Sequence, residues 1–343
     1  MLKLGVSYFA SRHLKHVAED LKDIKKHHCD WVLHTFDEVD LRFNSGQMKT
    51  ITSMSHKLGL KVYYSPWAIG GIFGGECISA FPGRHPEACQ VLSTGERVPY
   101  ACPSHPEFRK FMKTWIEAAC AAGGDVLFWD EPHLWLPNWE GRPERDDEFS
   151  IGSPYAQALF RKKYKKPVPK RKTAEVEEFR DWLLYDFLKW AMQTAKKIRP
   201  NIKNAVCLVS HLGALEPPLW NKVASIKELD IVATDPYWKR FPYSNPAKDK
   251  MEGYIDLMAG KVVELCKKHG KEPQGWLQIF ALRKQDEPDI DKAIRLLHQS
   301  GITNIAAWGY EGCNAYSTIS SERGRACWDR LGRQYGKLKK KKA

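Results

Sequence analysis

Eight short apolar segments, separated by longer amphipathic ones, constrain the fold of this chain more than any other feature. The apolar segments span residues 3–8, 30–35, 60–65, 125–130, 204–210, 229–235, 275–280 and 303–308. Helical patterns fill the intervals, at 14–28, 46–58, 105–122, 174–199, 219–228, 247–270, 289–300 and 322–336. Alternation of this kind predicts a parallel sheet wrapped by helices. Eight repeats favour a single α/β domain, a (β/α)₈ barrel over residues 1–336, rather than an open doubly wound sheet.

Two of the connections are too long to be simple turns. They span residues 67–104 and 132–173, after the third and fourth predicted strands. Both follow the carboxyl end of a strand, which is the face where barrels of this type build their active sites. We therefore expect these long loops to shape a substrate cleft.

The formal net charge of +13 comes from two local segments. Residues 161–172 hold eight basic side chains and no acid, and residues 333–343 hold six more. Without these fourteen, 40 basic residues face 41 acidic ones, so the body of the chain is nearly neutral. We interpret both segments as solvated surface, with 337–343 as a disordered tail, while a polyanion contact stays open. No nucleic-acid or membrane partner is expected.

The nine cysteines include no Cys-x-x-Cys pair, so zinc-ribbon and iron–sulfur sites lose their main support. An odd number of cysteines favours reduced thiols. Met1 leads directly into an apolar, strand-like segment rather than into a charged and apolar leader. No run of 18 apolar residues occurs. These features predict a cytoplasmic protein.

Polar side chains gather where the predicted strands end. Asp130 and Asp235 directly follow the apolar runs VLFW and IVAT, and Glu131 follows Asp130. An acid at the end of a buried parallel strand is costly unless it faces the solvent-filled mouth of the barrel. Two facing carboxylates can act as acid and base, or as acid and nucleophile, on a glycosidic bond. The candidate catalytic residues are therefore Asp130, Glu131, Asp235 and Glu311.

Two of these acids have simpler interpretations. Asp235 precedes a proline and could serve a turn or a helix cap. Glu311 lies between Gly309 and Gly312 and could be a loop surface charge. Asp130 and Glu131 together exceed what a cap needs.

Tryptophans add a second indication. Six of the thirteen, at 67, 129, 135, 139, 238 and 308, lie at a predicted strand end or in the loop that follows. Aromatic faces stack on the C–H faces of sugar rings, so an aromatic cleft with a few acids suits carbohydrate, although Trp129 and Trp308 could be core residues. The candidate sugar-binding residues are Asp37, Trp67, His133, His211, Tyr237, Trp238, Gln278 and Trp308.

From residue 3 to about 330, the chain resembles glycoside hydrolase barrels. The resemblance rests on ACPSHPEFRKFM followed by DVLFWDEP, which is similar to the approach to the fourth strand in many such enzymes. In clan A enzymes an Asn-Glu-Pro at this strand holds the acid/base, which implies Glu131 here. Asp130 replaces the Asn, however, and Gln278 stands where that clan needs a nucleophilic Glu on the seventh strand.

A second resemblance is to α-glycosidase barrels of the α-amylase and α-galactosidase type. There an Asp that ends the fourth strand is the nucleophile, which implies Asp130. In the α-galactosidase type an Asp near the end of the sixth strand is the acid/base, which implies Asp235. The clan stays open, and the resemblance implies a glycosidase without a cofactor.

Two other functions remain as alternatives. Asp130, Glu131 and His133 could ligate a metal in a hydrolase or isomerase, but the short His-x-His and His-Glu-x-x-His spacings of zinc sites are missing. A non-catalytic carbohydrate-binding barrel would be favoured if lysine or arginine neutralised the strand-end acids. The sugar, its linkage and the oligomeric state stay open.

Overall fold

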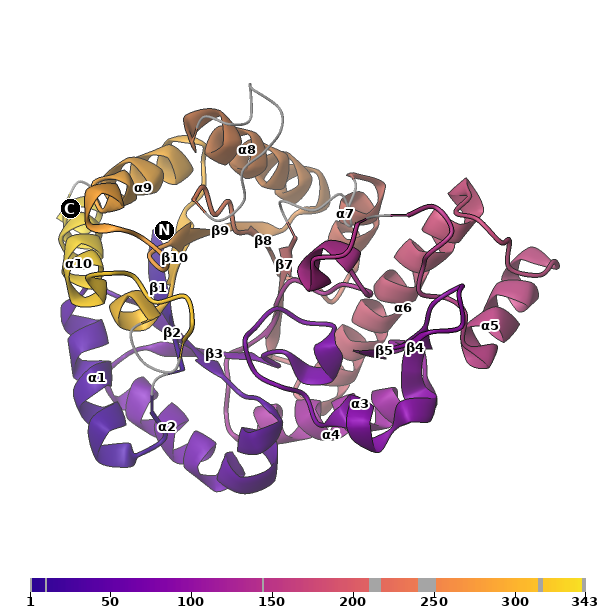
Figure 1. The fold of residues 1–343 in the computed structure, drawn as a ribbon. Coiled ribbons are helices and arrows are strands. Elements are labelled where there is room, and N and C mark those ends of the chain that lie inside the picture. The colour runs from indigo at the N-terminus through magenta and orange to yellow at the C-terminus, as the bar shows by residue number, and fades with distance from the viewer. Residues whose placement is uncertain are drawn as a thin grey trace.

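The computed structural model describes residues 2–9, 11–143, 145–209, 217–239, 251–313 and 317–340, and its centre is a closed barrel of eight parallel strands (Figure 1). In order around the barrel, the strands are β1 (Lys3–Tyr8), β2 (Trp31–Thr35), β3 (Lys61–Ser65), β6 (Val126–Trp129), β7 (Lys203–Leu208), β8 (Ile231–Thr234), β9 (Glu272–Gln278) and β10 (Asn304–Trp308). Pairing of β1 with β10 closes the ring. The predicted single (β/α)₈ barrel is confirmed.

Eight helices follow the barrel strands and cover the outside of the barrel. They are α1 (Leu14–Lys26), α2 (Ser45–Lys57), α4 (Pro106–Ala121), α6 (Ala174–Ile198), α7 (Pro217–Ala224), α8 (Met251–His269), α9 (Asp289–Gln299) and α10 (Gly324–Lys340). Short helical turns are η1 (Asp40–Asn44), η6 (Lys284–Asp286) and η7 (Tyr310–Cys313). The Thr173 hydroxyl caps α6 by accepting from the Val176 N–H. Helix α10 continues to Lys340, past residue 336 where the sequence suggested that the barrel domain ends.

Side chains alternate between the barrel interior and the layer under the helices, as the two-residue period of a strand requires. Within β2, Leu33 belongs to the interior cluster and Val32 to the outer one. Trp276 on β9 contacts Trp31 on β2 and Phe128 on β6, across the barrel. Gly5 makes room for Trp31, because a Cβ there would stand 2.2 Å from the indole ring. The interior is thus filled by side chains below the mouth.

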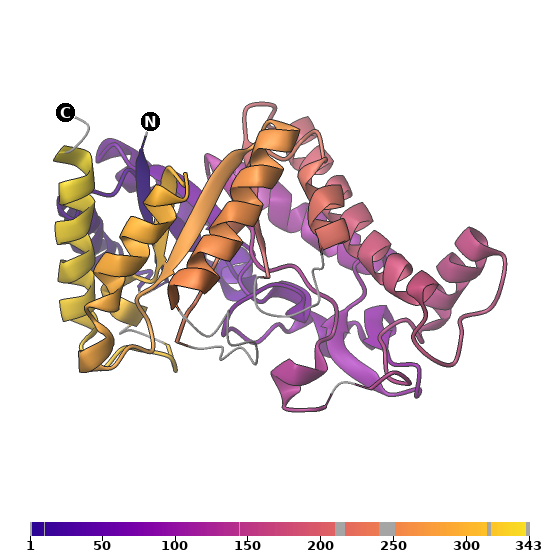
Figure 2. The same cartoon turned by 90° about the horizontal axis from the view of Figure 1, so that it is seen from above.

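The two long connections form a lobe beside the barrel (Figures 1 and 2). The first contains η2 (Ile69–Gly71), α3 (Phe81–Arg84), η3 (Pro86–Ala88) and an antiparallel pair, β4 (Cys89–Val91) and β5 (Arg97–Ala101); the second contains η4 (Pro137–Glu140) and α5 (Pro154–Tyr164). The connections bind each other through the Gly152 N–H, which donates to the Val91 carbonyl at 2.6 Å. Sequence reasoning missed α5, although Ser153 caps it and Pro154 opens it.

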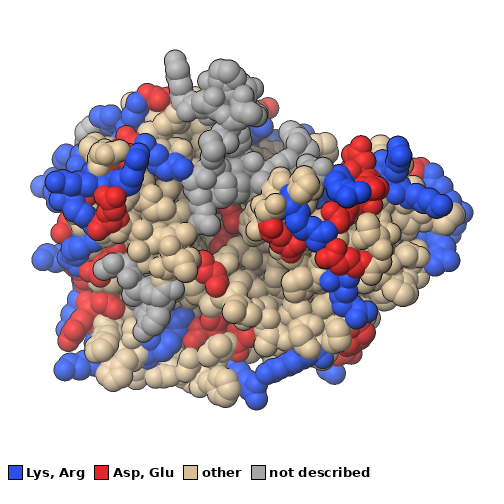
Figure 3. Space-filling view, viewed as in Figure 1, with Lys and Arg blue, Asp and Glu red and all other residues tan. Residues whose placement is uncertain are grey.

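The two basic segments lie at opposite ends of the molecule. Residues 161–172 belong to the lobe, and α10 carries the other segment on the far side of the barrel (Figures 1 and 2). Figure 3 shows the face of the molecule that is seen in Figure 1, with Lys and Arg at both of its ends and with Asp and Glu visible in its hollowed centre. Among the described residues, no helix is long and apolar enough to cross a membrane.

Candidate active site

The carboxyl ends of the barrel strands meet at a pocket of about 370 Å³. Four strands contribute the lining that sequence reasoning expected: Trp67 follows β3, Asp130 and Glu131 follow β6, Asp235 and Tyr237 follow β8, and Trp308 ends β10. The structure thus brings together three of the four candidate catalytic acids. It also brings together three of the eight candidate sugar-binding residues.

Asp130 and Glu131 lie against a glycine of the β3 connection. A Cβ on Gly74 would stand 2.8 Å from Glu131 Oε2 and 3.4 Å from Asp130 Oδ2, so only glycine lets the backbone approach both carboxylates. The Gly74 N–H donates to the Asp130 carbonyl at 3.1 Å. Burial and the neighbouring Glu131 carboxylate raise the pKa of Asp130 well above its usual value. Asp130 therefore resists ionisation and can carry a proton in this pocket.

Asp235 is buried and approaches the same space from β8. Its backbone carbonyl accepts from the Tyr237 N–H at 2.7 Å, which fixes the turn at the end of the strand. Burial raises the pKa of Cys207 on β7, and the charges of Asp235, Asp130 and Glu131 raise it further. Because β7 lies between β6 and β8, that shared influence indicates three acids facing one region of the mouth.

Aromatic side chains form the walls of the pocket. Trp67 and Trp308 both pack on Phe9, with ring centroids 5.0 and 5.6 Å away. Tyr237 meets Phe280 edge to face at 4.9 Å. Trp139, from η4, is 38% exposed and lines the outer part of the pocket. Aromatic faces beside a few acids form the combination that suits a sugar ring.

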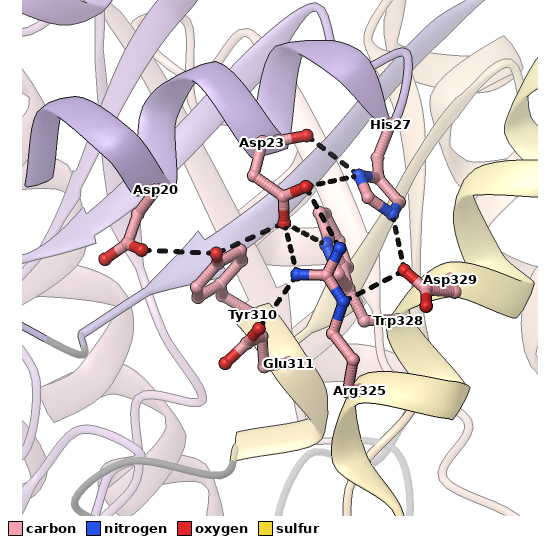
Figure 4. Close-up of polar contacts among 8 residues, drawn as sticks. All are labelled: Asp20, Asp23, His27, Tyr310, Glu311, Arg325, Trp328 and Asp329. Atoms are coloured by element: carbon pink, nitrogen blue, oxygen red, sulfur yellow. Dashed lines mark hydrogen bonds and ion pairs between the residues drawn. The ribbon is translucent and has the colours of Figure 1, made fainter. Parts of the chain in front are cut away.

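Glu311, the fourth candidate acid, does not line the pocket. It lies in η7 and accepts a hydrogen bond from Arg325 of α10 at 2.9 Å. Arg325 also pairs with Asp23 of α1 and with Asp329, so this network ties the first helix to the last (Figure 4). The structure supports the surface-charge interpretation of Glu311.

Three of the candidate sugar-binding residues hold the loops at the mouth and do not line the pocket. Asp37 accepts from the Asp40 N–H at 2.8 Å and from the Cys77 thiol at 3.1 Å. Gln278 is buried, accepts from the Lys239 N–H and donates to the Phe280 carbonyl. Trp238 packs against the outer core.

Of the two histidines proposed to bind sugar, the structure describes only one. His133 is buried behind the pocket, and its Nδ1 lies 2.6 Å from the Glu131 carbonyl oxygen. His211 lies outside the described residues.

Sequence reasoning left several lining residues off its candidate list. They are Gly75, Glu76, Asn138, Trp139, Phe280 and Ile319. Glu76 accepts from the Ser317 hydroxyl at 2.6 Å and from the Thr318 N–H at 3.0 Å, which joins the β3 connection to the loop after β10. The Gly-Gly-Glu run at 74–76, inside a long loop at the catalytic face, was the available signal.

The neighbours of the pocket acids bear on the two alternative functions, a metal-dependent enzyme and a non-catalytic carbohydrate-binding barrel. Within the described ranges, no group of three or more His, Cys, Asp and Glu side chains is arranged to hold a metal ion. Nor does any described Lys or Arg form an ion pair with Asp130 or Glu131, as a non-catalytic barrel would favour. The charge that raises the pKa of Asp130 is that of its neighbour Glu131.

No family model matches the chain, and no curated protein matches it in sequence. Solved structures, however, match this chain in fold. A β-galactosidase from the Antarctic haloarchaeon Halorubrum lacusprofundi superposes with a TM-score of 0.71 at 10% identity, over 98% of this chain and 58% of that one. A β-galactosidase from the psychrophilic Marinomonas ef1 gives 0.68 at 11% identity, over 98% and 60%.

The chain thus spans about three fifths of those β-galactosidases. An endo-1,4-β-mannanase from Rhizomucor miehei matches nearly end to end, with a TM-score of 0.62 at 9% identity over 99% and 95% of the two chains. The resemblance expected from the strand-end motifs is confirmed for the fold: this chain has the (β/α)₈ barrel found in these glycoside hydrolases.

Proposed function

We propose that this protein cleaves or transfers a glycosidic bond with carboxylates at the mouth of the barrel. One observation carries the proposal: three acids from β6 and β8 share an aromatic-lined pocket, where burial and the Glu131 charge raise the pKa of one of them, Asp130. A proton donor beside ionisable carboxylates is what hydrolysis of a glycoside requires. The barrel shared with β-galactosidases and a mannanase supports the same reaction class.

Asp130 is the proposed general acid. Its raised pKa favours the protonated carboxyl group, which can then give its proton to the glycosidic oxygen. As the bond between the anomeric carbon and that oxygen breaks, the Asp130 proton moves to the departing oxygen. Glu131 follows on the same strand end, and its charge maintains the raised pKa of Asp130.

Asp235 is the proposed second carboxylate. It comes from β8, two strands around the barrel from β6, and so approaches the substrate from another side. There it either bonds to the anomeric carbon, for later release by water, or takes a proton from a water that attacks this carbon. Trp67, Trp139 and Trp308 supply faces for stacking sugar rings. We also propose a cytoplasmic location, supported by free thiols such as those of Cys29, Cys89 and Cys327.

The test is the dependence of rate on the leaving group. Asp130→Asn cannot protonate the leaving oxygen, so it should lose at least about a hundredfold in kcat/KM on oligosaccharides. It should lose far less on 2,4-dinitrophenyl glycosides, whose leaving group needs no proton. Asp235→Asn should fail on both substrates. Equal, small losses for Asp130→Asn on both substrates would refute its role as the acid.

A further inference from the structure

His133 joins two parts of the pocket. Its backbone N–H donates to the Ile72 carbonyl at 3.0 Å, which ties the β6 loop to the β3 connection. Its buried ring contacts the Glu131 carbonyl through Nδ1 at 2.6 Å. The ring also packs against Trp139, with ring centroids 4.2 Å apart. One side chain therefore touches the backbone of a proposed active-site acid and a proposed sugar-stacking residue.

Glu131 needs such support, because its backbone is strained. Its φ is +38°, in the left-handed region that disfavours any residue with a Cβ. A strained conformation persists only where its surroundings hold it. The Gly74 N–H holds the preceding carbonyl, of Asp130, and His133 holds the carbonyl of Glu131 itself.

The protonation of the ring follows from its surroundings. Burial lowers the pKa of His133, opposed by the hydrogen bond to the Glu131 carbonyl and by the Glu131 charge. The imidazole is therefore neutral at neutral pH, with a single N–H. Since a carbonyl oxygen can only accept, the contact at Nδ1 requires the proton there. His133 acts as a fixed donor to Glu131, not as a group that exchanges protons during turnover.

We infer that His133 is a positioning residue that sets two properties of the pocket separately. Its Nδ1–H fixes the backbone of Glu131, and its ring fixes Trp139. The sequence suggested direct contact with sugar for His133, whereas it is buried and lies behind the lining residues. This inference rests on the proposed function, because it assigns the two effects to catalysis and to binding.

Two substitutions separate these roles. His133→Asn keeps an N–H close to the place of Nδ1 but removes the ring, so KM should rise about tenfold with kcat changed less than about twofold. His133→Phe keeps a ring against Trp139 but removes the donor, so kcat should fall at least about tenfold while KM stays within about twofold. A merely structural role would give no such split.

The pH profile supplies an independent measurement. The Glu131 charge raises the pKa of Asp130, so displacing Glu131 should move the alkaline limb of kcat to lower pH. His133→Phe should show this shift, as should Glu131→Gln, and His133→Asn should not. The inference would be overturned if both His133 variants changed kcat and KM by the same factors and the alkaline limb of kcat stayed at its native pH in both. Full activity of Asp130→Asn and Glu131→Gln would instead overturn the proposed function.

Discussion

The Asp130→Asn variant should become more stable than the native protein by an amount that grows as the pH rises. The folded state raises the pKa of Asp130, so between the unfolded and folded pKa values the folded chain holds a proton that the unfolded chain has released. Stability of the native protein therefore falls with increasing pH over that window. The asparagine side chain does not titrate, so the variant lacks this loss.

The size of the effect follows from linkage. One proton held by the folded state and released by the unfolded state changes the free energy of unfolding by about 1.4 kcal/mol per pH unit. The stability difference, variant minus native, should be constant below about pH 4, where Asp130 is protonated in both states. Above that it should rise with a slope approaching about 1.4 kcal/mol per unit, then level off at the folded pKa. Any fixed effect of the new amide shifts the whole curve without changing its slope.

Urea unfolding followed by tryptophan fluorescence, at half-unit steps from about pH 4 to 8, measures this curve. Asp286→Asn is the matched control. Bonds from Arg283 and Lys239, both of which stay charged over this range, lower the pKa of the Asp286 carboxyl group. Its contribution is present above the unfolded pKa and is lost as the pH falls, so Asp286→Asn should destabilise at neutral pH, with no slope between about pH 5 and 8. A flat or falling curve for Asp130→Asn would refute the reasoning.

Two further predictions concern the surroundings of the pocket. Gly74→Ala places a Cβ 2.8 Å from Glu131 Oε2, so kcat should fall at least about tenfold while the fold is retained. Gly46→Ala is the control, because its new Cβ meets nothing within 4 Å, and it should leave kcat unchanged. Equal kcat values in the two variants, with both folded by circular dichroism, would contradict this prediction. Arg325→Met breaks the ion-pair network but leaves the pocket intact, so it should lower stability by roughly 1 kcal/mol in 0.1 M salt, and less at 1 M, with kcat unchanged. Glu311→Gln should likewise keep full turnover, and a large loss would return this acid to the catalytic set.

The barrel was predictable because its signal is repeated along the whole chain. Each strand is a short apolar run between amphipathic segments, and the eight repeats support one another. Helix α5 was missed because it lies within the long connection after β6, which was interpreted as a loop, and because its last turn enters the basic segment. Its start nevertheless carries a Ser-Pro signal at 153–154.

The site was predictable only in part. Asp130, Glu131 and Asp235 follow buried strands, and the end of a barrel strand fixes which face a side chain reaches. Glu311 follows a strand as well, but its loop turns it toward Arg325 of the last helix. Gln278 ends β9 itself, and its buried amide bonds to the backbone of Lys239 and Phe280 instead of lining the pocket. Glu76 and Trp139 reach the pocket from long insertions, whose paths depend on tertiary packing rather than on strand order.

The most direct test of the central claim is the cleavage rate of glycosidic bonds by the native protein and by two pocket variants. A panel of 4-nitrophenyl α- and β-glycosides and neutral oligosaccharides identifies the preferred substrate, and kcat/KM on the best oligosaccharide is then measured. The account predicts turnover by the native protein and losses of at least about a hundredfold in Asp130→Asn and Asp235→Asn, each still folded by circular dichroism. Undiminished turnover in both variants would contradict it.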